Sequence, residues 1–410
     1  MKCYYHNYVN SFIDFLVPKG EQVKRISYGT KEIIPNDKNT DYLVIKDALA
    51  HVPDVQEFLE DASGLLTDSG RIIITQYSSL WEPVLTLASK LKLRMPIKEQ
   101  NWLSLLDMKN FAYLSGLEVV KSGTKMILPI YIPLISAFFN KFIANIFPFS
   151  RLGIFHYLVL RKRMQNDHTT PKSVSIIVAA RNEAGTIEKI VQELPELGSS
   201  TEIIFIEGNS TDNTYEEIKR VAEKYKDAKK IKYGKQEGRG KGDAVRKGFD
   251  MATGDILMIY DADMTVPAEE IYKFYDSIVT NKGEFINGSR LVYPLEKESM
   301  RFFNIIGNKF FSFAFSAILG QTLKDTLCGT KVLWKKDYES IKENRKFFGD
   351  FDPFGDFDLL FGAAKLNLKI IDLPVHYKER KYGKTNISRW SHGWLLLKMT
   401  LFAARKIKFI

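Results

Sequence analysis

Two aspartates, Asp261 and Asp263, directly follow a short apolar run and are separated only by Ala262. The run, residues 256–260 (ILMIY), is typical of a strand buried on both faces of a parallel sheet. Ligands of open α/β sheets collect outside the carboxyl ends of such strands, so we expect both carboxylates at the mouth of the sheet. Their oxygens suit Mg²⁺ or Mn²⁺, which in turn would hold a diphosphate. Taken alone, an Asp-x-Asp pair is more often a solvated turn, so its surroundings decide.

A glycine-rich basic loop precedes this strand. Gly238, Gly240 and Gly242 surround Lys241. A flexible backbone with one lysine suits a bound phosphate, although glycine loops are more often only turns. The next residue, Asp243, fits the N-cap of a helix better than a catalytic acid.

Three polar residues follow an earlier apolar run, residues 173–180. Arg181, Asn182 and Glu183 stand where that run ends. Their backbone and side-chain groups could hold a nucleoside base and ribose at the carboxyl end of a strand. The alternative is an ordinary polar cluster at the start of a helix.

The elements that must position these residues alternate along the chain. Strands are predicted at 173–180, 202–207 and 256–260. The helices between them have apolar residues at helical spacing, namely Ile187, Ile190, Val191 and Leu194, then Tyr215, Ile218, Val221, Ala222 and Tyr225. Such alternation predicts an α/β fold with a parallel, doubly wound sheet.

Residues 1–163 are expected to form a separate unit. Strands are predicted at 41–45, 71–76, 117–120 and 155–160, with a helix over 55–66 and a turn at 68–70. The stretch 41–75 resembles the middle and later part of a class I S-adenosylmethionine-dependent methyltransferase. The chain before it is too short for that family's cofactor loop, and residues 27–30 (SYGT) lack the glycine pattern. We therefore expect a truncated, Rossmann-like, non-catalytic domain with no S-adenosylmethionine.

Residues 173–410 carry an ordered set of motifs: AARNEAGTI, FIEGNSTDNT, GRGKGDAVRKGF, TGDILMIYDADMTVP, INGSR, DTLCGTKV, FDLLFGAAKLNLKIIDLPV and ERKYGKTNIS. Together they resemble family 2 glycosyltransferases of the GT-A fold, similar to dolichyl-phosphate mannosyltransferase and other polyprenyl-phosphate glycosyltransferases. The resemblance implies a nucleotide-sugar-binding fold with a mostly parallel sheet. It further implies a metal-dependent inverting transfer from a nucleotide-diphosphate sugar to polyprenyl phosphate. The expected domains are 1–163, a linker at 164–172, the transferase at 173–387 and a helix at 388–410.

The same resemblance implies roles for individual residues. The nucleotide sugar would contact Arg181, Asn182, Glu183, Glu207, Lys241, Asp261 and Arg290. The metal, Mg²⁺ or Mn²⁺, would be held by Asp261 and Asp263. The catalytic residues would be Asp358, Asp325 and Arg380, and the acceptor phosphate would be bound by Lys331, Arg380 and Lys384.

The nature of the acceptor decides whether a general base is needed. A sugar hydroxyl would require one, and Asp358 fits the family's acidic position better than Asp356. A lipid phosphate is already anionic, so Arg380 and Lys384 would only orient it. The family usually has aspartate at Glu207 and lysine at Asn386, and some members have a further metal ligand at Thr265. These departures affect the base preference, one phosphate contact and the metal.

Composition sets the broader limits. The 410 residues carry a net charge of +10, which favours anionic partners. Nucleic acid has only this charge in its favour and is not expected. Cys3 and Cys328 are the only cysteines, which argues against a disulfide scaffold and fits a reducing cytoplasm. No signal peptide or spanning helix is evident, so the expected location is cytoplasmic, peripheral on the inner face of the membrane.

Two segments offer contacts with a bilayer. Residues 388–410 read as a basic, aromatic, amphipathic helix suited to an anionic surface, or equally to docking on the protein's own sheet. Residues 126–149 are apolar with only Lys141 charged, and fit a core, a lid or a membrane-facing surface.

Three alternative functions stay open. The enzyme could act on a sugar hydroxyl in surface glycan synthesis. A bifunctional methyltransferase and glycosyltransferase would require cofactor binding by residues 1–163. The third alternative is a non-catalytic binding or scaffolding protein, which would be favoured if no nucleotide sugar bound in the presence of metal.

Overall fold

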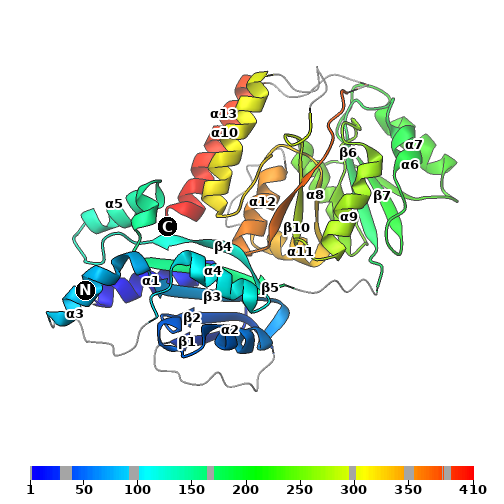
Figure 1. Ribbon diagram of the computed structural model, residues 1–410. Coiled ribbons are helices and arrows are strands. Elements are labelled where there is room, and N and C mark those ends of the chain that lie inside the picture. The colour runs from blue at the N-terminus through cyan, green and yellow to red at the C-terminus, as the bar shows by residue number, and fades with distance from the viewer. Residues whose placement is uncertain are drawn as a thin grey trace. The chain divides into compact units, whose positions relative to one another are not determined.

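The computed structural model describes residues 2–27, 39–91, 101–163, 170–294, 302–345, 355–380, 382 and 389–410. It divides into two compact units: unit 1 comprises residues 1–164 with 405–410, and unit 2 comprises residues 165–404. Each unit contains its own sheet (Figure 1).

Unit 1 is built on a mixed sheet in the order β1-β2-β3-β5-β4. Its strands are β1 (Val23–Ser27), β2 (Thr40–Lys46), β3 (Leu66–Tyr77), β4 (Leu117–Lys125) and β5 (Phe155–Lys162). The first three are parallel, whereas β5 runs antiparallel to both β3 and β4. The four predicted strands are therefore confirmed. The turn expected at 68–70 lies within β3 instead, where the partner residue in β3 jumps from Leu66 to Arg71 as a bulge.

Helices cover both faces of this sheet. They are α1 (Lys2–Leu16), α2 (Val55–Gly64), α3 (Glu82–Lys90), α4 (Leu105–Leu114) and α5 (Ile135–Lys141). One core lies under α2 and α4, and the other lies under α1, whose buried Val9 and Ile13 pack near Val44 and Ile73. Alternate residues of β2 and β3 thus point to opposite cores, as the pleat of a strand requires.

Unit 2 is an α/β layer structure with a mixed sheet in the order β12-β10-β11-β9-β6-β7-β8. Its strands are β6 (Val174–Ala180), β7 (Thr201–Glu207), β8 (Lys230–Lys235), β9 (Ile256–Ile259), β10 (Phe285–Ser289), β11 (Lys331–Trp334) and β12 (Ile370–Pro374). Only β11 among them runs antiparallel, to β9 and to β10. The prediction of an α/β fold with a mostly parallel sheet is confirmed.

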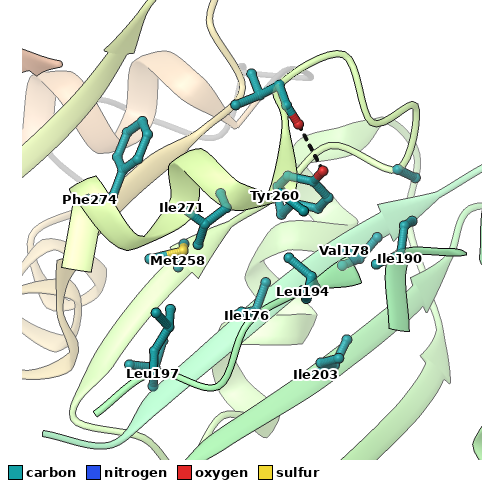
Figure 2. Packing of buried hydrophobic residues seen from close by; sticks show 14 of the residues in the cluster. Ile176, Val178, Ile190, Leu194, Leu197, Ile203, Met258, Tyr260, Ile271 and Phe274 are labelled. Atoms are coloured by element: carbon teal, nitrogen blue, oxygen red, sulfur yellow. Dashed lines mark hydrogen bonds between the residues drawn. The ribbon is translucent and has the colours of Figure 1, made fainter. Parts of the chain in front are cut away.

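The helices of unit 2 lie on both faces of the sheet. They are α6 (Ile187–Glu193), α7 (Thr214–Lys224), α8 (Lys241–Met251), α9 (Ile271–Val279), α10 (Phe302–Leu319), α11 (Lys335–Glu343), α12 (Asp356–Lys365) and α13 (Arg389–Ala403). The core under α6, α7 and α9 includes Ile176, Ile190 and Met258, as Figure 2 shows. On the other face Gly248 of α8 packs against Ile177, where a side chain would clash.

Helices α10 and α13 pack side by side (Figure 1). Leu396, Met399 and Ala403 of α13 are buried, and this helix packs against α10 of its own unit. The last residues, Arg405–Ile410, belong to unit 1. Within the described ranges, no helix is long and apolar enough to cross a membrane.

Candidate active site

The two aspartates stand at the carboxyl end of β9, as predicted. The hydroxyl of Tyr260 donates to the carbonyl oxygen of Val266 at 2.8 Å and so ties the ends of their loop together (Figure 2). Thr265 Oγ1 donates to Asp263 Oδ1 at 2.9 Å. The loop therefore lies on the buried core of β9 and holds the Asp263 carboxylate in one orientation.

Lys241 neutralises the first aspartate. It is the first residue of α8, and its Nζ lies 2.5 Å from Asp261 Oδ1. Burial alone would raise the pKa of the Asp261 carboxyl, but Lys241, with Lys331 and Arg290 farther away, outweighs it and the pKa is lowered. Asp261 is thus a carboxylate at neutral pH. The glycine-rich loop brings its lysine to Asp261, whereas its expected contact was a bound phosphate.

Arg380 bridges the second aspartate and Glu183. Its guanidinium donates to Asp263 Oδ2 at 2.7 Å and to Glu183 Oε1 at 2.5 Å. Burial raises the pKa of the Glu183 carboxyl to about 7, against the lowering effect of Arg380. The segment after β12 thereby joins the loops after β6 and β9, because residues far apart in sequence meet at one edge of the sheet.

Asp325, which we expected as a catalytic residue, lies behind Arg290. Its side chain is fully buried and accepts from Arg290 Nε at 2.7 Å, Arg290 Nη2 at 2.9 Å and Asn308 Nδ2 at 2.7 Å. The guanidinium of Arg290 also lies 5.0 Å from the ring centre of Tyr377. Asp325 therefore positions Arg290 from behind.

Lys331 also lies behind the site. We expected it at an acceptor phosphate, but it is fully buried in β11, where its Nζ donates to the carbonyl oxygen of Cys328. The buried ammonium supports the negative charge of Asp261 electrostatically. The antiparallel insertion of β11 beside β9 places it there.

Asp358 is nearly buried in the first turn of α12. Its Oδ2 accepts from Arg345 Nε at 3.0 Å. An ion-paired carboxylate is a poor proton acceptor, because the neighbouring positive charge favours its charged form. This geometry gives little support to Asp358 as a general base.

The loops after β6 and β7 are tied to each other. Asn182 Oδ1 accepts from the backbone N–H of Thr211 at 2.8 Å, and Glu207 Oε1 accepts from that of Ser210 at 2.5 Å. Arg181 is exposed beside them. Asn182 and Glu207 thus fix the loop after β7, and Asn182 ties it to the loop after β6.

The predicted helix cap and three of the predicted residues near the site differ from or lie outside what the structure describes. Asp243 is not the N-cap of α8: Gly240 takes that position, and Asp243 Oδ2 accepts from the backbone N–H of Gly238 at 2.7 Å, which fixes the glycine-rich loop. Lys384 and Asn386 lie outside the described residues, as does the side chain of Asp356.

The donor set fits a divalent cation only in part. Asp261 and Asp263 offer hard oxygen ligands, and Mg²⁺ is commonly held by one or two carboxylates together with substrate phosphates. Within the described ranges, no group of three or more His, Cys, Asp or Glu side chains could hold a metal. The remaining ligands would have to come from a diphosphate and water.

Sequence reasoning missed the residues that frame the carboxylates. A Cβ at Gly329 would overlap the Asp261 carboxylate and the Lys241 Nζ, and one at Gly185 would lie 2.5 Å from the ring of Tyr382. Asn308, from the middle of α10, reaches Asp325. The glycine in DTLCGTK was visible in the sequence, but its close approach to Asp261 depends on the sheet order.

The Gly329 contact gives a direct test. We expect Gly329→Ala to lower turnover about 10²-fold, because displacing catalytic groups by about 1 Å costs that much. The matched control is Gly307→Ala in α10, where nothing lies within 4 Å of the added methyl group and turnover should be unchanged. Steady-state kinetics measure the turnover of both variants, and their thermal midpoints show whether they fold. Equal turnover in the two would show that Asp261 and Lys241 are free to shift without consequence.

Comparison with known proteins agrees with this geometry. Residues 175–342 match the model of the family Glycosyl transferase family 2. Glycosyltransferase AglJ of Haloferax volcanii is 27% identical over 229 residues, which cover 55% of this chain and 70% of that protein. Dolichol-phosphate mannosyltransferase of Pyrococcus furiosus is 29% identical over 247 residues, covering 58% and 67%. The Saccharomyces cerevisiae protein of that name is 34% identical over 109 residues, covering 25% and 40%.

Among solved structures, glucosyl-3-phosphoglycerate synthase from Mycobacterium tuberculosis in complex with Mn²⁺, UDP and glucosyl-3-phosphoglycerate superposes with a TM-score of 0.42. The sequence identity is 16%, over 58% of this chain and 80% of that chain. The family match begins at residue 175, so the methyltransferase resemblance of residues 1–163 stays a prediction. The chain carries a family 2 glycosyltransferase domain, and the prediction of a glycosyltransferase is confirmed.

Proposed function

We propose that the protein is a metal-dependent inverting glycosyltransferase that moves a sugar from a nucleotide-diphosphate sugar to a polyprenyl phosphate. The observation that carries this proposal is the charge arrangement at the end of β9, where Asp261 and Asp263 face Lys241 and Arg380. Two carboxylates among basic groups suit a cation, a leaving diphosphate and a second anion together. Two relatives bear the name dolichol-phosphate mannosyltransferase, which supports a lipid phosphate as acceptor.

The residues of the chain would share the work as follows. An acceptor phosphate oxygen forms a bond to the anomeric carbon while the bond from that carbon to the diphosphate oxygen breaks, and the diphosphate keeps the electron pair. Lys241 and Arg290 lie near the carboxylates as positive charges for the diphosphate. Arg380 is a bidentate fork suited to the acceptor phosphate. A divalent cation held by Asp261 and Asp263 would offset the charge that develops on the leaving group.

A phosphate acceptor also removes the need for a general base. Asp358 is nearly buried and paired with Arg345, whereas a phosphate nucleophile is already anionic at neutral pH. The second candidate, a sugar hydroxyl as acceptor, would need Asp358 to leave this pair. The geometry therefore favours the lipid phosphate.

Helices α10 and α13 of unit 2 offer a surface that could contact the membrane that holds a lipid-linked acceptor. Helix α10 holds the Asp325 loop with its inner side, since Ser312 Oγ donates to the carbonyl oxygen of Lys324 at 2.7 Å. Its outer side exposes Phe310 and Phe313. Trp394 of the adjoining α13 is exposed as well, with Lys398 Nζ 5.6 Å from its ring centre. Apolar side chains next to basic ones favour contact with the cytoplasmic face of the cell membrane.

The test is a transfer assay with the full-length protein. It contains Mg²⁺ or Mn²⁺, polyprenyl phosphate and a panel of labelled UDP-, GDP- and dTDP-sugars, and counts the label in the organic and aqueous phases. Metal-dependent label in the organic phase is the expected result and names the donor. Nucleotide release without lipid labelling would contradict the lipid acceptor.

Asp358→Asn separates the two acceptors. If the acceptor is a phosphate, the variant should keep turnover within about tenfold, because no proton has to be removed. A loss of about 10²-fold or more would indicate a general base and a hydroxyl acceptor. The thermal midpoint of the variant controls for loss of the Arg345 pair.

We propose that unit 1 is a truncated methyltransferase-like domain that does not bind S-adenosylmethionine. Titration calorimetry with S-adenosylmethionine tests this. Measurable affinity would revive a bifunctional enzyme.

A further inference from the structure

The segment around α5 in unit 1 buries polar side chains and exposes apolar ones. Ser136 and Asn140 of α5 are buried, whereas Ile135 and Phe138 of the same helix are exposed. Tyr131, Leu134 and Phe147, on either side of α5, expose 69%, 87% and 67% of their surface. A helix on the surface of a globular protein shows the opposite pattern. We call the exposed apolar side chains of residues 131–147 the 131–147 patch.

The buried polar side chains satisfy the backbone of this segment. Asn140 Oδ1 accepts from the backbone N–H groups of Ile127 and Leu128 at 3.0 and 2.8 Å, and its Nδ2 donates to the Leu128 carbonyl at 2.7 Å. Ser136 Oγ accepts from Ile132 N at 2.7 Å and donates to the Ile130 carbonyl at 2.6 Å. With these backbone groups bonded internally, the outer surface of the segment can enter a medium without water.

The charged residues near the 131–147 patch indicate which apolar medium it would enter. Residues 126–163 contain no aspartate or glutamate, and neither do residues 389–410. Lys141 and Arg151 lie in the segment, and the tail of the chain brings Arg405 and Lys406 to the same unit. Phe409 of that tail contacts Phe142, with ring centres 5.4 Å apart. Exposed aromatic and aliphatic side chains in a segment whose own charged residues are all basic complement acyl chains under anionic headgroups.

We infer that the 131–147 patch inserts into the interface of an anionic bilayer and anchors unit 1 there. The inference does not depend on the proposed acceptor, because binding to lipid is measured without donor or turnover. It gives unit 1 a function of its own. Contact of α10 and α13 with lipid is a separate matter, since those helices belong to unit 2.

The experiment uses the full chain and vesicles of phosphatidylcholine with and without phosphatidylglycerol. The double substitution Leu134→Glu and Phe147→Glu should lower the partition coefficient for the anionic vesicles at least about tenfold, because it replaces apolar anchors by charges of the headgroups' own sign. The matched control is Leu106→Glu in α4, a leucine of unit 1 that is 76% exposed outside the patch. It should bind like the wild type. Equal binding of the double variant and the control would overturn the inference.

A second measurement protects the test against misfolding. Relative to the wild type with its five native tryptophans, Leu134→Trp should add fluorescence that lipids with brominated acyl chains quench, and the fluorescence added by Leu106→Trp should not be quenched. An unquenched Trp at 134 in vesicle-bound protein would contradict insertion. Dimers of the wild type without lipid, abolished by the double substitution while vesicle binding is kept, would identify the patch as a contact between copies and would also overturn the inference.

Discussion

Asp263→Asn is expected to lower kcat/KM about 10³-fold, the loss that follows when one preorganised group stabilising the leaving charge is removed. The substitution keeps the shape of the side chain and the acceptor oxygen for Thr265, but it removes the charge that pairs with Arg380 and that the proposed divalent cation would share. Turnover is measured over a range of Mg²⁺ or Mn²⁺ concentrations. The variant should also need more metal for half-maximal rate, because one charged ligand of the proposed metal site is lost.

The control for Asp263→Asn is Asp276→Asn. Asp276 lies on α9 and forms a surface ion pair with Lys282 at 2.6 Å, which contributes little to stability. Its substitution should leave turnover and metal dependence unchanged. Since Arg380 keeps Glu183 as partner in the Asp263 variant, the fold should survive, and the thermal midpoint checks this. Full turnover of Asp263→Asn at the usual metal concentration would contradict the proposed metal site.

Local patterns were sufficient for seven strands, β2 to β7 and β9, but not for β1, β8, β10, β11 and β12. The place of Arg380 near Asp261 and Lys241 was expected from the family resemblance. Buried strands are short apolar runs, and parallel strands bring the residues after them to one edge. Helix α1 was missed although Tyr5, Val9, Phe12 and Leu16 recur at helical spacing, because polar residues between them hid the period. The helical period of α1 is therefore present in the sequence, although it was not recognised.

The burial of Asp325 and Lys331 could not be predicted in the same way. Both follow the turn-like stretch after α10 and are charged, which in a sequence favours a solvated or substrate-facing position. Their burial depends on β11 entering the sheet antiparallel between β9 and β10, and on Asn308 and Arg290 reaching Asp325 from other elements. These are pairings between distant residues, and a single sequence contains no periodic signal for them.

The buried ion pair leads to the second large effect, on stability. Asp325→Ala should lower the free energy of unfolding of unit 2 by about 3–5 kcal/mol, because Arg290 is left as a buried charge without its carboxylate. A chain with two units need not unfold in one step. The loss is therefore measured by hydrogen exchange, resolved by mass spectrometry, in peptides that cover β10 and β11. Unchanged protection of β10 would contradict the prediction.

The double variant Arg290→Met with Asp325→Leu provides the control, since it removes both charges. It should regain most of the lost stability, because replacing a buried pair by apolar side chains is often neutral. Turnover should stay low, since Arg290 is then missing from the site. Low stability together with full turnover would show instead that Arg290 has only a structural role.

The pH dependence of the pair has a definite sign. Burial would raise the pKa of the Asp325 carboxyl, but Arg290 and Asn308 lower it to about 2, from an ordinary value of 3.8. A carboxyl whose pKa is lower in the folded state stabilises the fold above its ordinary pKa and loses that contribution as the pH falls toward the folded value. The shift corresponds to about 2 kcal/mol. Thermal scans from pH 5 downward should therefore show unit 2 of the wild type losing stability more steeply than the double variant, and parallel curves would refute this coupling.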